Sequence, residues 1–210
     1  MLKDSVYQPQ FTHADVEILE QSWLHRGFVQ VELSLLRHKQ FKDLGFSPIL
    51  KREIAHRRAA AGVFVHDPEL KKFLLIEQFR LGAIDADDTP WQLEIIAGLI
   101  DDGEDAETCL RREALEEAGC TLKELKFLHK YYPSTGASDE LFSLYIATAD
   151  LSQSGGVFGE ESEGEDIKVH IFDYHDIDTL LQGGYVRNAA LLIALQHFSF
   201  YLYKLEEVSS

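Results

Sequence analysis

The sequence is poor in cysteine and in long hydrophobic runs. Its two cysteines, Cys109 and Cys120, lack the paired short spacings of a zinc site and suggest no disulfide framework. No apolar run approaches the roughly 20 residues that span a bilayer. The first ten residues also lack the apolar core of a signal peptide. These absences predict a cytoplasmic protein in a reducing compartment, with no membrane as partner.

Positive charge is scarce as well. Only 20 Lys and Arg stand against 36 Asp and Glu, which gives a formal net charge of −16 over 210 residues. This balance argues against a general binder of DNA, RNA or anionic membranes, so no nucleic acid is expected as partner. An anionic substrate would need local cations. Hydrophobic residues make up 45% and charged residues 27%, which is typical of a globular chain with a substantial core.

The N-terminal part of the chain changes its hydrophobic period. Residues 12–23 carry helical spacing, with Thr12 or Asp15 as the N-cap. From 27 to 35 apolar and polar residues alternate, which predicts a strand with one solvated face. A second extended stretch, 49–56, follows a link that contains glycine and proline.

The chain is therefore predicted to contain a small, mostly β module over 1–55 and a main domain over 56–210. The best predicted helix of the main domain is 105–118, closed by Gly119, and a second runs from 188 to about 204. Strands and helices mix without βαβ regularity, which predicts an α/β (α+β) fold with a mixed sheet flanked by helices. The predicted strands are 61–65, 73–76, 91–96, 125–132, 141–148 and 167–172.

The predicted helix 105–118 carries an acidic ridge. Glu113 and Glu117 lie one turn apart on one face, and Glu116 lies beside them. On an arbitrary helix such a ridge is a solvated surface. Facing a cleft, each pair at about 5 Å would repel by about 3 kcal/mol and would need hard divalent cations such as Mg²⁺. The side expected to pack on the sheet consists of Ala106, Leu110, Ala114, Leu115 and Ala118.

The spacing of this segment identifies a family. It resembles the Nudix hydrolase box, Gly-x5-Glu-x7-Arg-Glu-U-x-Glu-Glu-x-Gly-U, where U is apolar; chance would match all seven fixed positions about once in a million chains. The resemblance implies a Nudix α/β/α sandwich that hydrolyses nucleoside diphosphate derivatives with Mg²⁺ or Mn²⁺, two or more ions. Ala114 and Cys120 fill the apolar positions with small residues. The matching residues are Gly98, Glu104, Arg112, Glu113, Glu116, Glu117 and Gly119.

Similarity outside the box covers nearly the whole chain. Segments such as 11–28, 76–80, 90–98 and 163–170 resemble the bacterial ADP-ribose pyrophosphatases. This resemblance implies hydrolysis of ADP-ribose to AMP and ribose 5-phosphate by a homodimer that exchanges its N-terminal β modules. Three alternatives stay open: a pyrophosphatase for another nucleotide sugar such as GDP-mannose, a non-catalytic ADP-ribose sensor, and an interaction protein with an acidic helix.

The resemblance also implies roles for single residues. Glu163, in an acidic glycine-rich loop, matches the general base, and Arg112 would orient the box carboxylates. Each of these residues also has a structural interpretation, as a solvated loop, a surface ion pair or a packed aromatic ring. The implied metal ligands are the Ala97 carbonyl, Glu113, Glu117, Glu165 and, as a further one, Glu116; the implied substrate-binding residues are Phe28, Arg52, Arg80 and Glu94.

Overall fold

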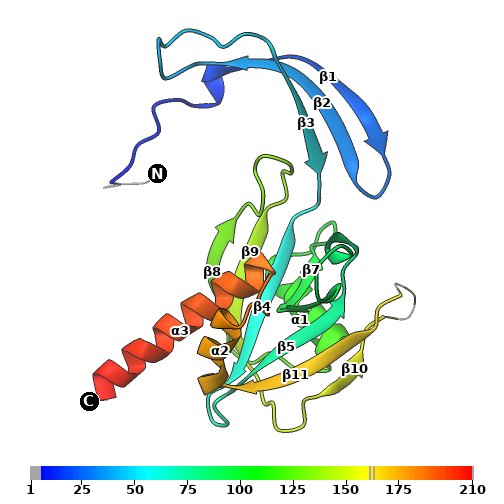
Figure 1. Cartoon of the computed structure of the whole chain (residues 1–210), viewed down its shortest axis with the longest axis vertical. Helices are drawn as coiled ribbons and strands as arrows, with labels where there is room; N and C mark the ends of the chain where they lie inside the picture. The colour runs from blue at the N-terminus through cyan, green and yellow to red at the C-terminus, as the bar shows by residue number, and fades with distance from the viewer. Residues whose placement is uncertain (1–5, 161, 163, 210) are drawn as a thin grey trace. The chain divides into compact units, whose positions relative to one another are not determined.

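The computed structural model describes residues 6–160, 162 and 164–209, with side chains described up to residue 204 (Figure 1). It divides into two compact units. The small unit comprises 1–57 together with 134–140, and the large unit comprises 58–133 and 141–210. The small unit is therefore discontinuous in the chain.

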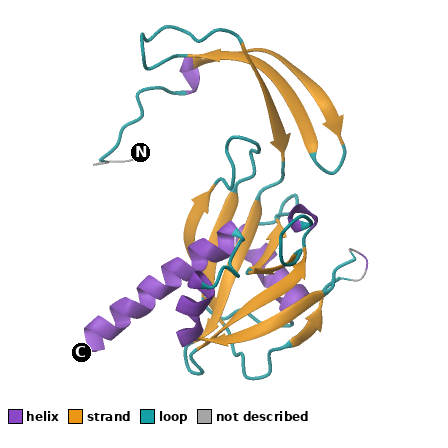
Figure 2. Ribbon diagram, in the orientation of Figure 1, coloured by secondary structure: helices purple, strands orange, loops and turns teal. Residues whose placement is uncertain are grey.

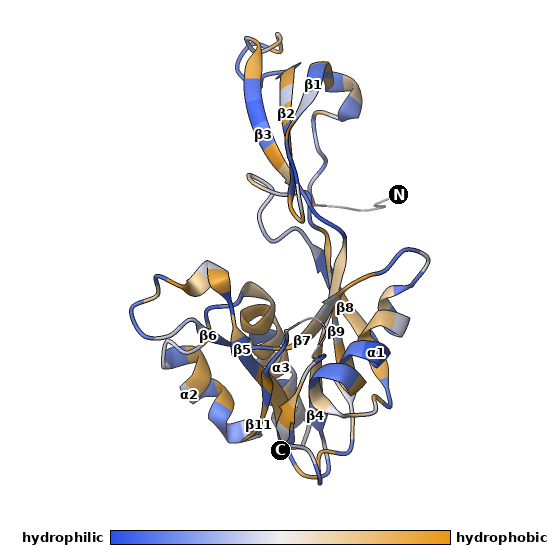
Figure 3. Ribbon diagram, turned by 90° about the vertical axis from the view of Figure 1, so that its right-hand side faces the viewer, coloured by the Kyte–Doolittle hydropathy of each residue, from blue (hydrophilic) through white to orange (hydrophobic). Residues whose placement is uncertain are grey.

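The small unit is a three-stranded antiparallel sheet with the strand order β1-β2-β3. Its strands carry both hydrophilic and hydrophobic residues (Figure 3). A short 3₁₀ helix, η1 (His13–Asp15), precedes the sheet, which contains β1 (Val16–Arg26), β2 (Gln30–His38) and β3 (Leu50–His56). The strands predicted at 27–35 and 49–56 are thus confirmed.

The helix predicted over 12–23 is wrong. Thr12 does cap a helical turn, because its side chain accepts the Ala14 N–H, but the turn ends at Asp15 and the chain continues as β1. Two register shifts in the pairing of β1 with β2, at Ile18/Glu20 and at Trp23/His25, interrupt the strict alternation of a strand. Because of these interruptions, the apolar residues of β1 have the spacing of a helix. The hydrophobic period alone therefore predicted a helix where the chain forms a strand.

The large unit contains an eight-stranded mixed sheet with the order β10-β11-β5-β4-β9-β8, in which β6 pairs with β5 and β7 with β4. The β4–β9 pair is parallel, and the other pairs are antiparallel. Its strands are β4 (Ala60–Asp67), β5 (Lys72–Phe79), β6 (Trp91–Glu94), β7 (Ile96–Leu99), β8 (Leu125–Tyr131), β9 (Phe142–Thr148), β10 (Gly156–Phe158) and β11 (Ile167–Asp173). Its helices are η2 (Leu81–Ala83), α1 (Ala106–Ala118), η4 (Tyr174–Asp176), α2 (Ile177–Gln182) and α3 (Ala189–Ser209).

Helices cover both faces of this sheet (Figure 2). On one face, Leu110 and Ala114 of α1 pack into a core with Ile76 of β5. On the other face, Leu191 and Phe198 of α3 pack into a second core, which also includes residues of α2. The predicted mixed sheet flanked by helices is therefore confirmed.

Two further features of the described chain concern its cysteines and its helices. Cys109 and Cys120 are buried and form no disulfide. Within the part of the chain that the structure describes, no helix is both long and apolar enough to cross a membrane.

Candidate active site

Helix α1 begins and ends where its sequence provides caps. The carboxylate of Asp105 accepts the Thr108 amide N–H at 2.8 Å. Gly119 ends the helix in the left-handed region, at φ 59°. These local signals fix the register of the helix, and with it the directions of the box side chains.

One member of the predicted apolar side of α1 is misplaced. Leu110, Ala114 and Ala118 are buried as expected, but Leu115 is 55% exposed. Leu115 follows Ala114 directly and therefore lies about 100° further round the helix, away from the sheet.

The carboxylate of Glu117 is buried rather than solvated. Glu117 is only 2% exposed, and its Oε2 accepts the backbone N–H of Ala97 at 3.1 Å. Burial raises the pKa of Glu117 well above its ordinary value, and the negative charges of Glu113 and Glu165 act in the same direction. The hydrogen bond from Ala97 and the charge of Arg80 oppose this rise only in part. The site therefore holds a carboxylate whose charge the surrounding protein does not compensate.

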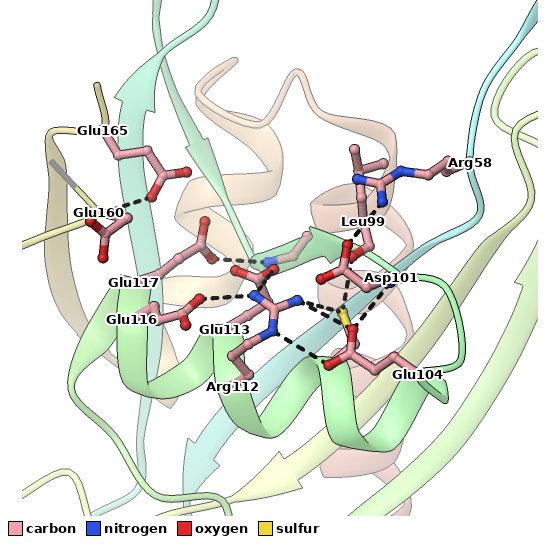
Figure 4. Close-up of polar contacts among 12 residues, drawn as sticks. Arg58, Leu99, Asp101, Glu104, Arg112, Glu113, Glu116, Glu117, Glu160 and Glu165 are labelled. Carbon is pink, nitrogen blue, oxygen red and sulfur yellow. Dashed lines mark hydrogen bonds and ion pairs between the residues drawn. The ribbon is translucent and has the colours of Figure 1, made fainter. Parts of the chain in front are cut away.

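Arg112 connects three of the box glutamates (Figure 4). Its Nη1 donates to Glu113 Oε1 at 2.8 Å and to Glu116 Oε2 at 2.9 Å. Its Nη2 lies 3.3 Å from Glu104 Oε2. Burial raises the pKa of Glu113, while the adjacent Arg112 lowers it. The contact between Arg112 and the carboxylates that the sequence implies is thus present in the structure.

Gly98 makes room for Glu113. A Cβ atom at position 98 would lie 1.8 Å from Glu113 Oε1, far inside van der Waals contact. Glu113 Oε1 occupies the space that the Cβ of any other residue at position 98 would fill. Glycine at the first position of the box is therefore required for Glu113 to keep this position.

The acidic loop that follows β10 is hydrogen-bonded to α1 at its first residue. Gly159 donates its N–H to the carbonyl of Glu116 at 3.2 Å, and Glu160 donates its N–H to Glu165 Oε2, also at 3.2 Å. The charge of Glu165 is among those that raise the pKa values of Glu113 and Glu117. Glu163, the predicted general base, lies outside the described residues.

The donor set of this site fits a hard divalent cation. Glu113, Glu117 and Glu165 offer carboxylate oxygens, and Ala97 offers a backbone carbonyl. Glu113 and Glu117 have pKa values raised by burial and by neighbouring carboxylates, Glu165 among them in both cases, which is the electrostatic situation that a bound cation relieves.

A different cluster has the tighter spacing. In the described ranges, the only three ligand atoms of His, Cys, Asp or Glu within 4.8 Å of one another belong to Asp173, His175 and Asp176. This cluster has a structural explanation, because Asp173 and Asp176 form the capping box of η4, with Asp173 N–H donating to Asp176 Oδ2 at 2.9 Å. The box glutamates, by contrast, are held on Ala97 and Arg112.

The four predicted substrate-binding residues are divided between the units. In the large unit, Arg80 Nη2 donates to Glu94 Oε2 at 2.7 Å, and Glu94 is buried. In the small unit, Phe28 is 86% exposed in the turn between β1 and β2, and Arg52 lies exposed on β3. The structure pairs Arg80 with Glu94, a contact that the sequence analysis did not predict.

The sequence analysis missed Gln78. This residue of β5 is 6% exposed, and its Nε2 is buried without a hydrogen-bond partner in the described structure. It lies two positions before Arg80, on the same strand as Ile76, which packs into the core together with residues of α1. The available signal was a polar amide two positions after the apolar strand segment 73–76. An unpaired buried donor of this kind is a candidate contact for a ligand.

Comparison with known proteins agrees with this geometry. A family model for the NUDIX domain matches residues 56–194. The ADP-ribose pyrophosphatase of Escherichia coli (strain K12) is 38% identical over 196 residues, which cover 93% of each chain. That of Haemophilus influenzae is 34% identical over 189 residues, covering 89% of this chain and 87% of the relative. A GDP-mannose pyrophosphatase of Cronobacter sakazakii is 33% identical over 152 residues, covering 70% and 76%.

A solved structure has the same fold. It is described as the crystal structure of an ADP compounds hydrolase, and it superimposes with a TM-score of 0.68 at 20% identity, covering 91% of this chain and 96% of that one. The family resemblance and the fold predicted from the sequence are both confirmed.

Proposed function

The chain belongs to the Nudix family, and we propose that it hydrolyses the pyrophosphate bond of ADP-ribose to AMP and ribose 5-phosphate. The observation that carries this proposal is the buried, uncompensated carboxylate of Glu117 beside Glu113 and Glu165. The choice of substrate is supported by coverage, since ADP-ribose pyrophosphatases match 93% of the chain and GDP-mannose pyrophosphatases match 70%.

Divalent metal use is general in this family, and we propose Mg²⁺ or Mn²⁺, two or more ions, for this chain. Glu113, Glu117, Glu165 and the Ala97 carbonyl would hold the metal, with Glu116 as a further ligand. When bound, the metal would neutralise the diphosphate and lower the pKa of water. The residues of the chain then have separate tasks: Arg112 holds Glu113 and Glu116 in place, and the Ala97 N–H orients Glu117.

Glu163 is assigned the role of the general base that accepts the proton of the attacking water. Water attacks one phosphorus, the bridging P–O bond breaks, and the Glu163 carboxylate accepts the proton. Support comes from the loop that carries this residue, because Gly159 binds the Glu116 carbonyl and thereby starts the loop at the box helix. Its glycines, Gly159 at φ 116° and Gly164 at φ 70°, have conformations that other residues rarely adopt.

Substrate recognition is proposed for Phe28, Arg52, Arg80 and Glu94. A half-exposed guanidinium can pair with phosphate, and Glu94 orients that of Arg80 through three hydrogen bonds. The exposed ring of Phe28 offers a face for stacking on adenine.

A substrate panel tests the proposal. The purified protein is assayed for hydrolysis of ADP-ribose, GDP-mannose and ADP-glucose with Mg²⁺, with Mn²⁺ and with excess EDTA. We expect ADP-ribose to give the highest kcat/KM, AMP and ribose 5-phosphate as its products, and no turnover in EDTA. A preference for GDP-mannose would favour the second candidate. Tight binding of ADP-ribose without hydrolysis would indicate a sensor.

The Arg112→Lys variant probes the geometry of the site. Lysine keeps the positive charge but cannot contact two carboxylates in the planar arrangement of a guanidinium. We expect kcat for ADP-ribose to fall about 10- to 100-fold, as for residues that orient metal ligands, with a smaller change in KM. Steady-state kinetics at several Mg²⁺ concentrations measures this. An unchanged kcat would remove Arg112 from the positioning role.

We also propose a homodimer in which the 1–55 module pairs with a second copy of the chain, within the cytoplasm. In the described residues of the small unit, no apolar side chain is buried, whereas Ile18 and Leu24 of β1 are 57% and 52% exposed. A three-stranded sheet without a buried apolar face needs another surface to cover it.

Light scattering tests this assembly. Coupled to size exclusion, it should give twice the 23.9 kDa chain mass for the wild type. The Ile18→Asp variant should shift towards the monomer, because a carboxylate is costly to bury in an apolar interface. A monomeric wild type would contradict the assembly.

A further inference from the structure

His56 lies between two carboxylates of the small unit. Its Nδ1 is 2.6 Å from Asp139 Oδ2, and its Nε2 is 3.4 Å from Glu32 Oε2. The Nε2 atom is buried from solvent and has no hydrogen-bond partner of good geometry in the described structure. The ring also forms a T-shaped contact with Trp23 of β1, with 5.3 Å between the ring centroids.

Only the doubly protonated ring suits both neighbours. A neutral imidazole carries one N–H, so one ring nitrogen would turn a lone pair towards a carboxylate. If the hydrogen is on Nδ1, that lone pair faces Glu32; if it is on Nε2, the lone pair faces Asp139 at 2.6 Å. The imidazolium donates to both, so the arrangement is the one a charged His56 requires.

Both carboxylates are themselves held by other donors. Glu32 Oε1 accepts from Ser34 Oγ at 2.6 Å and from Gln21 Nε2 at 2.7 Å. Asp139 Oδ1 accepts the backbone N–H of Arg57 at 2.9 Å. These bonds stabilise the ionised carboxylates and keep them directed at the ring.

Asp139 belongs to the 134–140 segment, which leaves the large unit between β8 and β9 and adds to the edge of β3. Two backbone hydrogen bonds hold it there: Ala55 N–H donates to the Ala137 carbonyl at 2.9 Å, and Asp139 N–H donates to the Ala55 carbonyl at 3.3 Å. Together they form a parallel bridge between Ala55 and Ser138. Because this backbone pairing is short, the ion pair of His56 with Asp139 is its main side-chain attachment to β3, together with Arg57 and Glu140 at 3.3 Å.

We propose that His56 is a proton-operated clamp: the imidazolium fastens the 134–140 segment to β3, and loss of its second proton weakens this attachment. The proposal is independent of the reaction assigned above, since it concerns only contacts within the small unit.

The direction of the pH dependence follows from the neighbours. The hydrogen bond to Asp139 raises the pKa of His56 most, Glu32 adds to the rise, and burial opposes it. The attachment of the segment is therefore strongest below the ordinary pKa of histidine and weakens as the pH rises through the raised value. The hydrogen bond from Ser34 lowers the pKa of Glu32, and that of Asp139 is also lowered, although its burial opposes this. On the Trp23 side of His56, the charged group is Arg26, whose guanidinium lies over the Trp23 ring.

Amide exchange of the full-length protein between pH 6 and 9 tests the clamp. Protection factors of the Ala55 and Asp139 amides, corrected for intrinsic exchange, should fall tenfold for each unit by which the pKa of docked His56 exceeds that of the released ring. Amides in the β1–β2 pair serve as the internal reference. In His56→Gln the two protection factors should be low and independent of pH.

The matched control is Arg37→Gln, which removes an exposed pair with Glu17 at 2.6 Å in the same unit and should leave the pH dependence unchanged. A direct NMR titration of the His56 ring in the wild type decides the matter even if a variant fails to fold. A ring pKa at or below 6.5, or protection that is constant with pH, would overturn the proposal.

Discussion

Replacing Glu117 by glutamine is expected to lower kcat/KM for ADP-ribose by about 10²–10³-fold while raising the melting temperature of the metal-free protein. Glutamine keeps the shape of the side chain and an oxygen that can accept the Ala97 N–H. It removes, however, a charge that the buried position disfavours. Function and stability should therefore change in opposite directions.

The pH dependence of stability gives a second readout of this variant. Because burial raises the pKa of Glu117 in the folded state, the ionised group opposes folding once the pH exceeds its unfolded pKa. In EDTA, the wild type should lose stability relative to Glu117→Gln as the pH rises from about 4.5 towards the raised value. Thermal melts from pH 4.5 to 8 measure the difference.

The control for this variant is Glu107→Gln, which removes an exposed carboxylate from the first turn of the same helix. It should change kcat/KM and the melting temperature little. Added Mg²⁺ should stabilise the wild type and Glu107→Gln more than Glu117→Gln. Full activity in Glu117→Gln would exclude this carboxylate as a metal ligand.

Replacing Gly98 by alanine is expected to displace Glu113. The new Cβ would meet Glu113 Oε1 at 1.8 Å and its Cδ at 2.2 Å, so the carboxylate must leave its position beside Arg112. We expect kcat/KM for ADP-ribose to fall by 100-fold or more, as for a misplaced reacting group, and the free energy of unfolding to fall by about 1–3 kcal/mol. Kinetics and chemical denaturation of the same preparation measure both effects.

Gly82→Ala is the matched substitution in the large unit. A Cβ at Gly82 would meet no atom within 4 Å, and its backbone does not have a positive φ. This variant should retain its activity and stability. If Gly98→Ala behaves in the same way, the close approach of Glu113 to the backbone is not needed for catalysis.

Local features of the fold could be predicted from the sequence. Helix α1 has its N-cap at Asp105 and its left-handed glycine at Gly119, both next to the residues that they affect. The contacts of Arg112 with Glu113 and Glu116, which the family resemblance implied, also arise within one helix.

Features that depend on distant partners could not be predicted in this way. The burial of Glu117 depends on Ala97, which lies on β7, and the pairing of Arg80 with Glu94 depends on the register of β5 with β6. Both contacts depend on which strands pair and in which register, and the hydrophobic period of the sequence does not specify this. His56 and Asp139 are separated by 83 positions, so nothing in the sequence around either residue indicated this contact.

The discontinuous small unit has a consequence for anyone who shortens the gene. Deleting the first 57 codons would leave the 134–140 excursion behind, with the Ala137 carbonyl and the Asp139 carboxylate deprived of the strand that binds them. A free-standing version of the large unit therefore needs two cuts: one after Arg57, and one that replaces the excursion with a tight hairpin joining β8 to β9.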